Sequence, residues 1–171
     1  VPSQRNGVSM KIAVFGNMDI EADSGVEVRR FEITSFYPNE KIDGLYYRIF
    51  VSNCIPELPR EAVMDFLKKA HGALEVNGEI IVQVPMAEFA AKQLFTNKAD
   101  PITYYMLYGT DEHPFRACYT MLQMRTLLAR AKFNVKEATE AILKLTTTDG
   151  EELNLPVHNL VAVRDIDQGE Q

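Results

Sequence analysis

A strand, a helix and a second strand follow one another between residues 42 and 85, and this succession constrains the fold of the chain more than any other feature. The first segment, Ile42–Val51, is rich in aromatic and β-branched residues, as buried strands are. Pro59 then begins a helix, and the second strand, Glu79–Val84, ends at Pro85. The apolar residues of the helix recur at helical spacing and form one face: Val63, Phe66, Leu67, Ala70 and Leu74. We expect Asn77-Gly78 to end this helix, with Gly78 in the left-handed conformation.

Strands and helices alternate over most of the remaining chain. Lys11–Phe15 predicts a strand that stops at Gly16, and Val26–Ile33 predicts another. Further on we expect one helix over Ala87–Leu94 and another after Thr120, with an irregular stretch over residues 95–115 between them. The C-terminal part is expected to contain a strand within Asn134–Leu145, a turn at Asp149-Gly150 and a last strand over Leu160–Val163. This order predicts an α/β fold of Rossmann-like type. Its sheet would be mostly parallel, covered by helices on both faces, with an antiparallel C-terminal strand.

The length of the chain fits one domain. Its 171 residues are enough to bury a substantial core, and we expect a single domain over residues 11–165. Residues 1–10 are polar, so we expect a flexible N-terminal leader, with Met10 a candidate for the authentic start. Residues 166–171 are expected to form a polar tail.

Charge and cysteine content narrow the range of partners. The formal net charge is −6, which argues against broad nucleic-acid binding or binding to an anionic membrane. No apolar run reaches the roughly 20 residues of a membrane span. The two cysteines, Cys54 and Cys118, make neither a disulfide framework nor a metal-site spacing. We therefore expect reduced thiols, a cytoplasmic protein and no metal site.

The segment IDGLYYRIFVSNCIPELPREAVMDFLKKAHGALEVNGEIIVQVP resembles the second half of class I S-adenosylmethionine-dependent methyltransferases. In that resemblance Ile42–Val51 is strand four, Glu79–Pro85 is strand five, and Ser52-Asn53 lies at the carboxyl end of strand four. The segment CYTMLQMRTLLARAKFNV is similar to a later helix of the family, with Lys132 where the family has glycine. A residue with a side chain in a left-handed turn costs about 1 kcal/mol, so we expect the turn at Lys132 to differ. The resemblance covers residues 11–165 and is closest to small proteins of type 11.

The resemblance implies a set of site residues. Asp19 would be the acid at the end of strand two that binds the ribose, and Glu32-Ile33 would lie beside the adenine. Polar side chains at the end of a buried strand face the ligand crevice of such folds, which adds Ser52 and Asn53. Family members carry a His-Arg or His-Lys pair before the later helix, which makes His113 and Arg116 candidate substrate contacts. Tyr104, Tyr105 and Tyr108 would form an aromatic lid over a planar or sugar substrate, or simply pack.

One departure from the family concerns its glycine-rich cofactor loop. Gly16 is the only glycine directly after the first strand, as a remnant of that loop or as an ordinary strand end. The first strand and helix of the fold are therefore shortened or deleted, and Lys11–Ile20 is then strand one or strand two. Losing the loop removes several backbone hydrogen bonds to the ligand, each contributing about 0.5–1.5 kcal/mol.

Two functions remain open from the sequence. The first is a methyltransferase that uses S-adenosylmethionine on an unknown small-molecule or macromolecular acceptor, without an identifiable catalytic residue. The second is a non-catalytic protein of the same fold that serves as a scaffold or as a subunit of a larger assembly, as a homo-oligomer or with a partner chain. The missing glycine loop favours the second, and the matching site residues favour the first.

Overall fold

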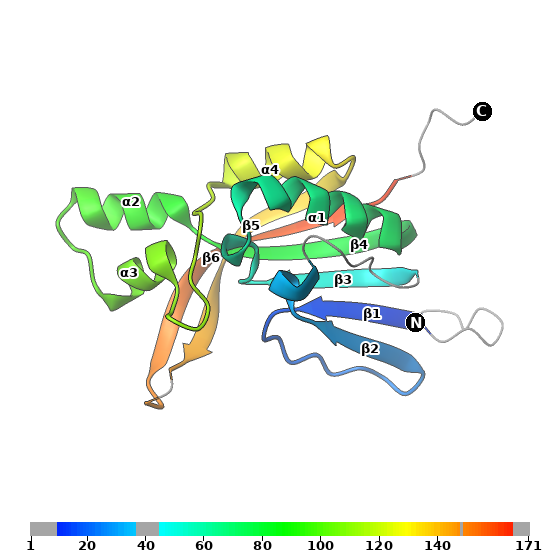
Figure 1. The fold of residues 1–171 in the computed structure, drawn as a ribbon, viewed down its shortest axis with the longest axis horizontal. Coiled ribbons are helices and arrows are strands. Elements are labelled where there is room, and N and C mark those ends of the chain that lie inside the picture. The colour runs from blue at the N-terminus through cyan, green and yellow to red at the C-terminus, as the bar shows by residue number, and fades with distance from the viewer. Residues whose placement is uncertain (1–9, 37–44, 148, 166–171) are drawn as a thin grey trace.

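The computed structural model describes residues 10–36, 45–147 and 149–165, which include one six-stranded mixed sheet. The strands are β1 (Met10–Phe15), β2 (Val26–Phe31), β3 (Tyr46–Ser52), β4 (Leu74–Pro85), β5 (Asn134–Thr146) and β6 (Glu152–Val163), in the spatial order β2-β1-β3-β4-β6-β5. The first four are parallel, and β6 is antiparallel to β4 and β5 (Figure 1). The predicted Rossmann-like sheet with an antiparallel C-terminal part is confirmed. Residues 1–9 of the proposed leader, the polar tail and residues 42–44 of the predicted strand lie outside the described residues, while Met10 begins β1.

The position of β1 defines the functional end of the sheet. The strand lies between β2 and β3, so the chain moves to one side of β1 first and to the other side later. Doubly wound sheets have their first strand at such a switch point, and ligands bind beyond its carboxyl end. The observed order fits β1 as strand one, and it fits equally well β1 as strand two of a sheet from which strand one is absent.

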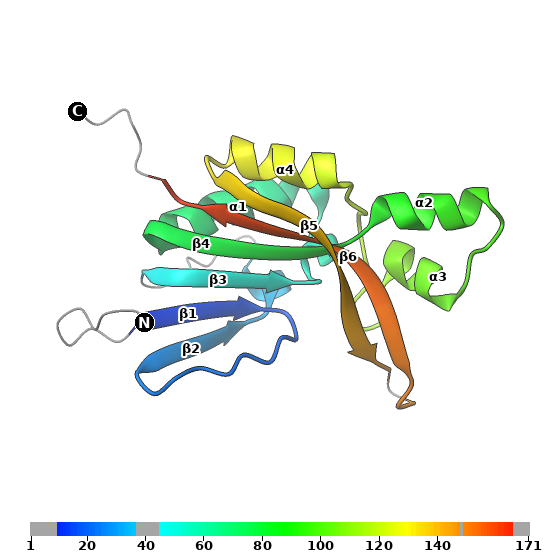
Figure 2. The same ribbon diagram turned by 180° about the vertical axis from the view of Figure 1, so that it is seen from behind.

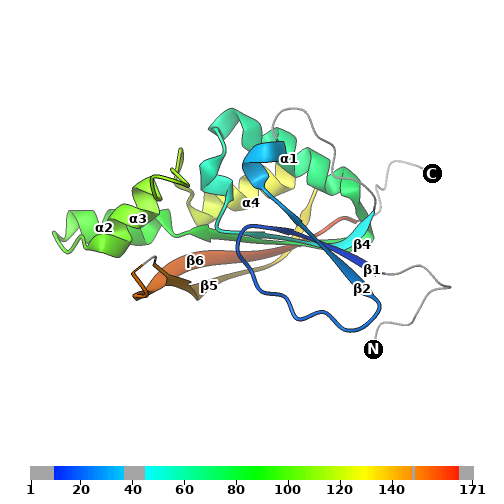
Figure 3. The same ribbon diagram turned by 60° about the horizontal axis from the view of Figure 1, so that its bottom comes forward.

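Two helices cover one face of the sheet. α1 (Arg60–Ala73) and α4 (Met121–Arg130) lie side by side over it (Figures 1 and 3). The core between them and the sheet includes Ile49, Val82, Leu67 and Leu128, all fully buried. We expected helices on both faces, but the connection between β1 and β2 contains no helix and lies on the opposite side (Figure 3). The chain is too short there to add one.

A second, smaller core extends the molecule beyond the sheet. The distal part of the β5–β6 hairpin leaves the sheet and lies beside α2 (Ala87–Phe95) and α3 (Pro101–Tyr108) (Figure 2). Ala90, Met106, Leu155 and Val157 are fully buried at this contact. This core holds α3 beside the carboxyl end of β3. None of the described helices is long and apolar enough to cross a membrane.

The prediction of an irregular stretch over residues 95–115 is wrong, because it contains α3. The Asp100 side chain accepts a hydrogen bond from the backbone of Thr103, and the Thr103 hydroxyl lies 3.3 Å from the Asp100 nitrogen. This reciprocal cap begins the helix, with Pro101 in its first turn. Asp100-Pro101 is a local signal for the start of a helix that was already present in the sequence.

Asn77 and Gly78 have different roles from those predicted. α1 ends at Ala73, and both residues lie within β4. Asn77, not Gly78, has the left-handed backbone, with φ of 64°. Gly78 is needed for space, because a Cβ there would lie 2.8 Å from the Glu75 carbonyl oxygen. The close neighbours of Gly78 lie in β4 itself and in β3, a packing that the local sequence does not reveal.

The turn after α4 keeps its left-handed residue although glycine is missing. Lys132 has φ of 68°, so the expectation that this turn differs is wrong. The Lys132 nitrogen donates to the Ala129 carbonyl, and the Phe133 nitrogen donates to the Leu128 carbonyl, each at 3.0 Å. This is the Schellman arrangement that ends many helices. Phe133 is buried, which holds the turn in place.

Replacing Lys132 by glycine is expected to stabilise the protein by about 1 kcal/mol, because glycine adopts this conformation without strain. The measurement is urea unfolding followed by circular dichroism. Lys144→Gly, at a regularly paired position of β5, is the control and should destabilise. A loss of stability in Lys132→Gly would contradict this account of the turn.

Candidate functional site

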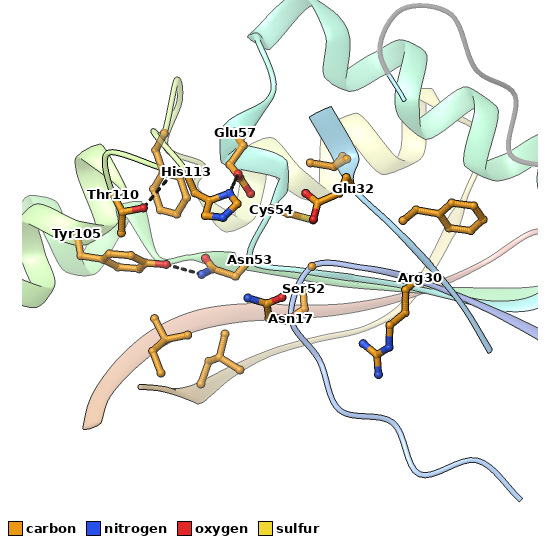
Figure 4. Close-up of a pocket in the computed structure, with 16 residues that line it drawn as sticks. Asn17, Arg30, Glu32, Ser52, Asn53, Cys54, Glu57, Tyr105, Thr110 and His113 are labelled. Atoms are coloured by element: carbon orange, nitrogen blue, oxygen red, sulfur yellow. Dashed lines mark hydrogen bonds and ion pairs between the residues drawn. The ribbon is translucent and has the colours of Figure 1, made fainter. Parts of the chain in front are cut away.

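A cavity of about 320 Å³ opens at the carboxyl ends of β1, β2 and β3. It lies at the switch point of the sheet, and its size is at the lower end for small-molecule sites. One side is formed by the strand ends, and the other by the region around α3 and the tip of the β5–β6 hairpin (Figure 4). Its lining includes Gly16, Asn17, Arg30, Glu32, Ile33, Ser52, Asn53, Cys54, Glu57, Tyr105, Thr110, His113, Phe115, Leu143 and Leu145.

Gly16 brings the ends of β1 and β3 into direct contact. Its φ is +92°, and a Cβ at this position would lie 2.1 Å from the Ser52 carbonyl oxygen. Glycine is therefore required here by the packing of two backbones. At the same level the rings of Phe15 and Phe31 stack with centroids 5.3 Å apart, which aligns the ends of β1 and β2. As a result Glu32, the residue after β2, lies at the cavity.

Ser52 is held by polar side chains that run across the sheet. Its hydroxyl donates to Gln83 Oε1 at 2.8 Å, and Gln83 Nε2 donates to Asn159 Oδ1 at 3.2 Å. Ser52 is buried, so this bond fixes its hydroxyl away from bulk water. The arrangement orders three neighbouring strands, β3, β4 and β6, beside the cavity.

Asn53 links the end of β3 to α3. Its backbone is left-handed, with φ of 53°, a conformation that asparagine tolerates better than most residues. The Asn53 nitrogen donates to the Gln83 carbonyl, and Nδ2 lies 2.8 Å from the Tyr105 hydroxyl oxygen. Asn53 Oδ1 is buried and has no hydrogen-bond partner among the described residues. A buried acceptor without a partner beside a cavity indicates that a ligand donor belongs there.

The carboxylate of Glu57 and the imidazole of His113 lie within ion-pair distance of each other at the cavity. His113 Nδ1 lies 2.7 Å from Glu57 Oε1, and the His113 side chain is about half exposed. Pro56 helps to form the 3₁₀ turn Ile55–Glu57 that presents the carboxylate. Burial raises the pKa of Glu57, although its hydrogen bond with His113 opposes this effect. The contact joins two segments that are far apart in the chain.

A tight turn holds His113 in this position. Gly109 has φ of 70°, and a Cβ there would lie 2.3 Å from the His113 carbonyl oxygen. Thr110 Oγ1 accepts from the His113 backbone nitrogen, and the Phe115 nitrogen donates to the Tyr108 carbonyl. The turn therefore fixes the position of His113 relative to the end of α3.

The charges around the cavity are mixed. Arg30 donates to the Met18 carbonyl at 2.7 Å, which ties β2 to the connection after β1. Glu32 and Glu57 supply carboxylates. Burial raises the pKa of the Cys54 thiol well above its usual value, and the two carboxylates raise it further. Cys54 is therefore a protonated, inert thiol rather than a nucleophile.

Most of the predicted site residues meet at the cavity. Those that line it are Gly16, Glu32, Ile33, Ser52, Asn53 and His113. Asp19 and Arg116 are exposed and do not line it. Asp19 was predicted as the acid that binds the ribose, but it lies exposed in the connection after β1, whereas Glu32, the acid after β2, lines the cavity.

Sequence reasoning missed Glu57, Asn17 and the apolar wall of Phe115, Leu143 and Leu145. Of the three tyrosines proposed as a lid, only Tyr105 lines the cavity, while Tyr104 and Tyr108 are exposed. One signal in the sequence distinguishes Tyr105. At helical spacing Tyr104 and Tyr108 lie on the same face of α3, and Tyr105 lies to one side of them. Nothing local indicates that Glu57 meets His113.

The fold is that of S-adenosylmethionine-dependent methyltransferases. The chain is similar to such a protein from Methanosarcina mazei, at 11% identity and TM-score 0.58, with 95% of each chain covered. It is also similar to a putative methyltransferase from Bacillus halodurans, at 13% identity and TM-score 0.55, covering 91% of this chain and 84% of the other. These identities show a shared fold only. No family model and no curated protein matches the sequence.

Some matched structures are much longer than this chain. It spans 57% of a protein from echinomycin biosynthesis, which it matches at 13% identity and TM-score 0.52 over 84% of its own length. Another match is covered over only 41% of its length. The activities of these whole proteins are therefore not carried over by the fold.

Proposed function

We propose that this chain binds S-adenosylmethionine at the cavity and transfers its methyl group to an acceptor. The observation that carries the proposal is the convergence of Glu32, Ser52 and Asn53 on one open cavity at the switch point of a methyltransferase fold. Free thiols at Cys54 and Cys118 support a reducing compartment, and we place the protein in the cytoplasm.

The residues present fit this ligand. Glu32 follows β2, the neighbour of the switch-point strand β1, and lines the cavity at the edge of the sheet where doubly wound nucleotide sites carry an acid for the ribose hydroxyls. Asn53 Oδ1 offers a buried acceptor without a partner among the described residues. The carboxylates of Glu32 and Glu57 favour a cation in the cavity, and the methyl donor is a sulfonium cation. When bound, it supplies an electrophilic methyl group.

The missing glycine loop limits how the donor is held. The β1–β2 connection contains no helix, so no helix N-terminus faces the cavity from this segment. Among the described residues that line the cavity, Arg30 is the one arginine or lysine, and we assign it to the carboxylate of the donor. In this assignment the Arg30 side chain takes the role that backbone hydrogen-bond donors have in the absent loop.

A non-catalytic scaffold is the second candidate, and the absent loop favours it. Such a protein would not need an open cavity at the switch point. In the described residues this cavity is open and lined by polar groups, which favours binding.

Titration calorimetry with S-adenosylmethionine and S-adenosylhomocysteine tests the proposal. We expect micromolar binding, which corresponds to about 8 kcal/mol. Glu32→Gln should weaken binding about tenfold or more, because a hydrogen bond to a charged group contributes about 1.5–3 kcal/mol. Asp19→Asn is the matched control and should bind like the wild type. No binding to the folded protein at millimolar ligand would overturn the proposal and leave the scaffold.

A further inference from the structure

The cavity has two chemically different sides. The strand ends contribute polar groups, including Arg30 and Glu32, while the opposite side carries Phe115, Leu143 and Leu145. Tyr105 packs edge-on against Phe115 with ring centroids 5.4 Å apart. An apolar wall of this kind suits a flat hydrocarbon or aromatic group rather than a sugar or a charged peptide.

The imidazole of His113 is oriented for proton transfer. Its Nδ1 faces Glu57, and Figure 4 shows the ring between Glu57 and the interior of the site. A carboxylate on Nδ1 favours the tautomer with the proton on that nitrogen, which leaves the lone pair on Nε2 free to accept a proton. Glu57 also stabilises the imidazolium once it forms.

We infer that His113 is a general base for a phenolic acceptor bound against Phe115, Leu143 and Leu145, with Glu57 as its positioning residue. This inference rests on the proposed function. The hydroxyl O–H bond breaks, an N–H bond forms at Nε2, and the electron pair stays on the acceptor oxygen. Glu57 balances the positive charge of the ring. The proton leaves to solvent from the exposed edge of His113.

The acidity of a phenol matches this base. A tyrosine-like hydroxyl has a pKa of about 10, low enough for a neighbouring imidazole to take its proton as the new bond to oxygen forms. An aliphatic alcohol is far less acidic and matches an imidazole base poorly. The other titratable groups that line the cavity are Glu32, Cys54, Tyr105 and Arg30.

The test uses 4-nitrophenol, whose ionised form is yellow, with the full chain and no methyl donor. We expect it to bind, and to ionise when bound at a pH about one unit lower than with His113→Gln. Glu57→Gln should lose most of that shift. Glu112→Gln removes an exposed carboxylate next to His113 in sequence and should keep it.

Three outcomes overturn the inference: no binding of 4-nitrophenol at millimolar concentration, an unchanged shift in His113→Gln, or an equal loss in Glu112→Gln. Circular dichroism checks that each variant is folded. Binding of S-adenosylhomocysteine is measured separately. Binding of S-adenosylhomocysteine without a nitrophenol shift removes this inference and leaves the proposed function. A nitrophenol shift without binding of S-adenosylhomocysteine removes the proposed function, and with it the role of His113 in methyl transfer.

Discussion

Gly16→Ala is expected to lower the free energy of unfolding by about 2–5 kcal/mol. The left-handed backbone costs about 1–2 kcal/mol with a side chain present, and forcing a methyl group into packed atoms costs about 1–3 kcal/mol more. The new Cβ would lie 2.1 Å from the Ser52 carbonyl oxygen, so β1 and β3 would have to separate. Urea unfolding measures the loss, and calorimetry should show that ligand binding falls with it.

Gly25→Ala is the matched control for this prediction. Gly25 has φ of +101°, but a Cβ there meets nothing within 4 Å. Gly25→Ala should therefore lower the free energy of unfolding only by the cost of the left-handed backbone, about 1–2 kcal/mol. Equal losses in the two variants would show that the contact between Gly16 and Ser52 has no energetic weight.

Glu88→Ala is expected to destabilise the protein by about 2–3 kcal/mol. His158 is buried on β6, and its Nε2 lies 2.9 Å from Glu88. Nδ1 of His158 already has no partner among the described residues, so the substitution would leave both ring nitrogens unpaired in the interior. Glu88 also accepts from the Met121 nitrogen at the start of α4. Thermal and urea unfolding measure the change, and Glu88→Gln should lose less.

The same carboxylate makes part of the stability depend on pH. Burial alone would raise the pKa of Glu88, but hydrogen bonds from His158 and from backbone nitrogens hold it below its usual value of 4.5. A lowered pKa means that the contribution is present above about pH 4.5 and is lost as the pH falls below it. Wild-type stability should therefore drop more steeply than that of Glu88→Gln between about pH 5 and pH 3. Parallel curves would contradict this role for Glu88.

Part of the candidate site could be predicted because strand ends are visible in sequence. Ser52-Asn53 follows an apolar run, and Glu32 follows another, so their position at one edge of a parallel sheet was predictable. Asp19 also follows an apolar run, but it is exposed and does not line the cavity. Its position depends on the path of the β1–β2 connection, which the strand pattern does not determine.

The sequence by itself determined the identity of most elements and the residues at their ends. Apolar spacing indicates α1, and Thr120 marks the start of α4 through its side-chain bond to the Gln123 nitrogen. These signals are local, since capping and periodicity act over a few residues. The same is true of Gly16 as a strand end, although not of its contact with Ser52.

Only the tertiary structure decided which residues meet. The Glu57–His113 contact joins positions 56 residues apart, and the Asn53–Tyr105 bond joins positions 52 apart. Both depend on α3 being held beside β3 by the second core, through Met106, Leu155 and Val157. Sheet order and the packing of that core are set by burial of apolar surface over the whole chain, which no short window of sequence contains.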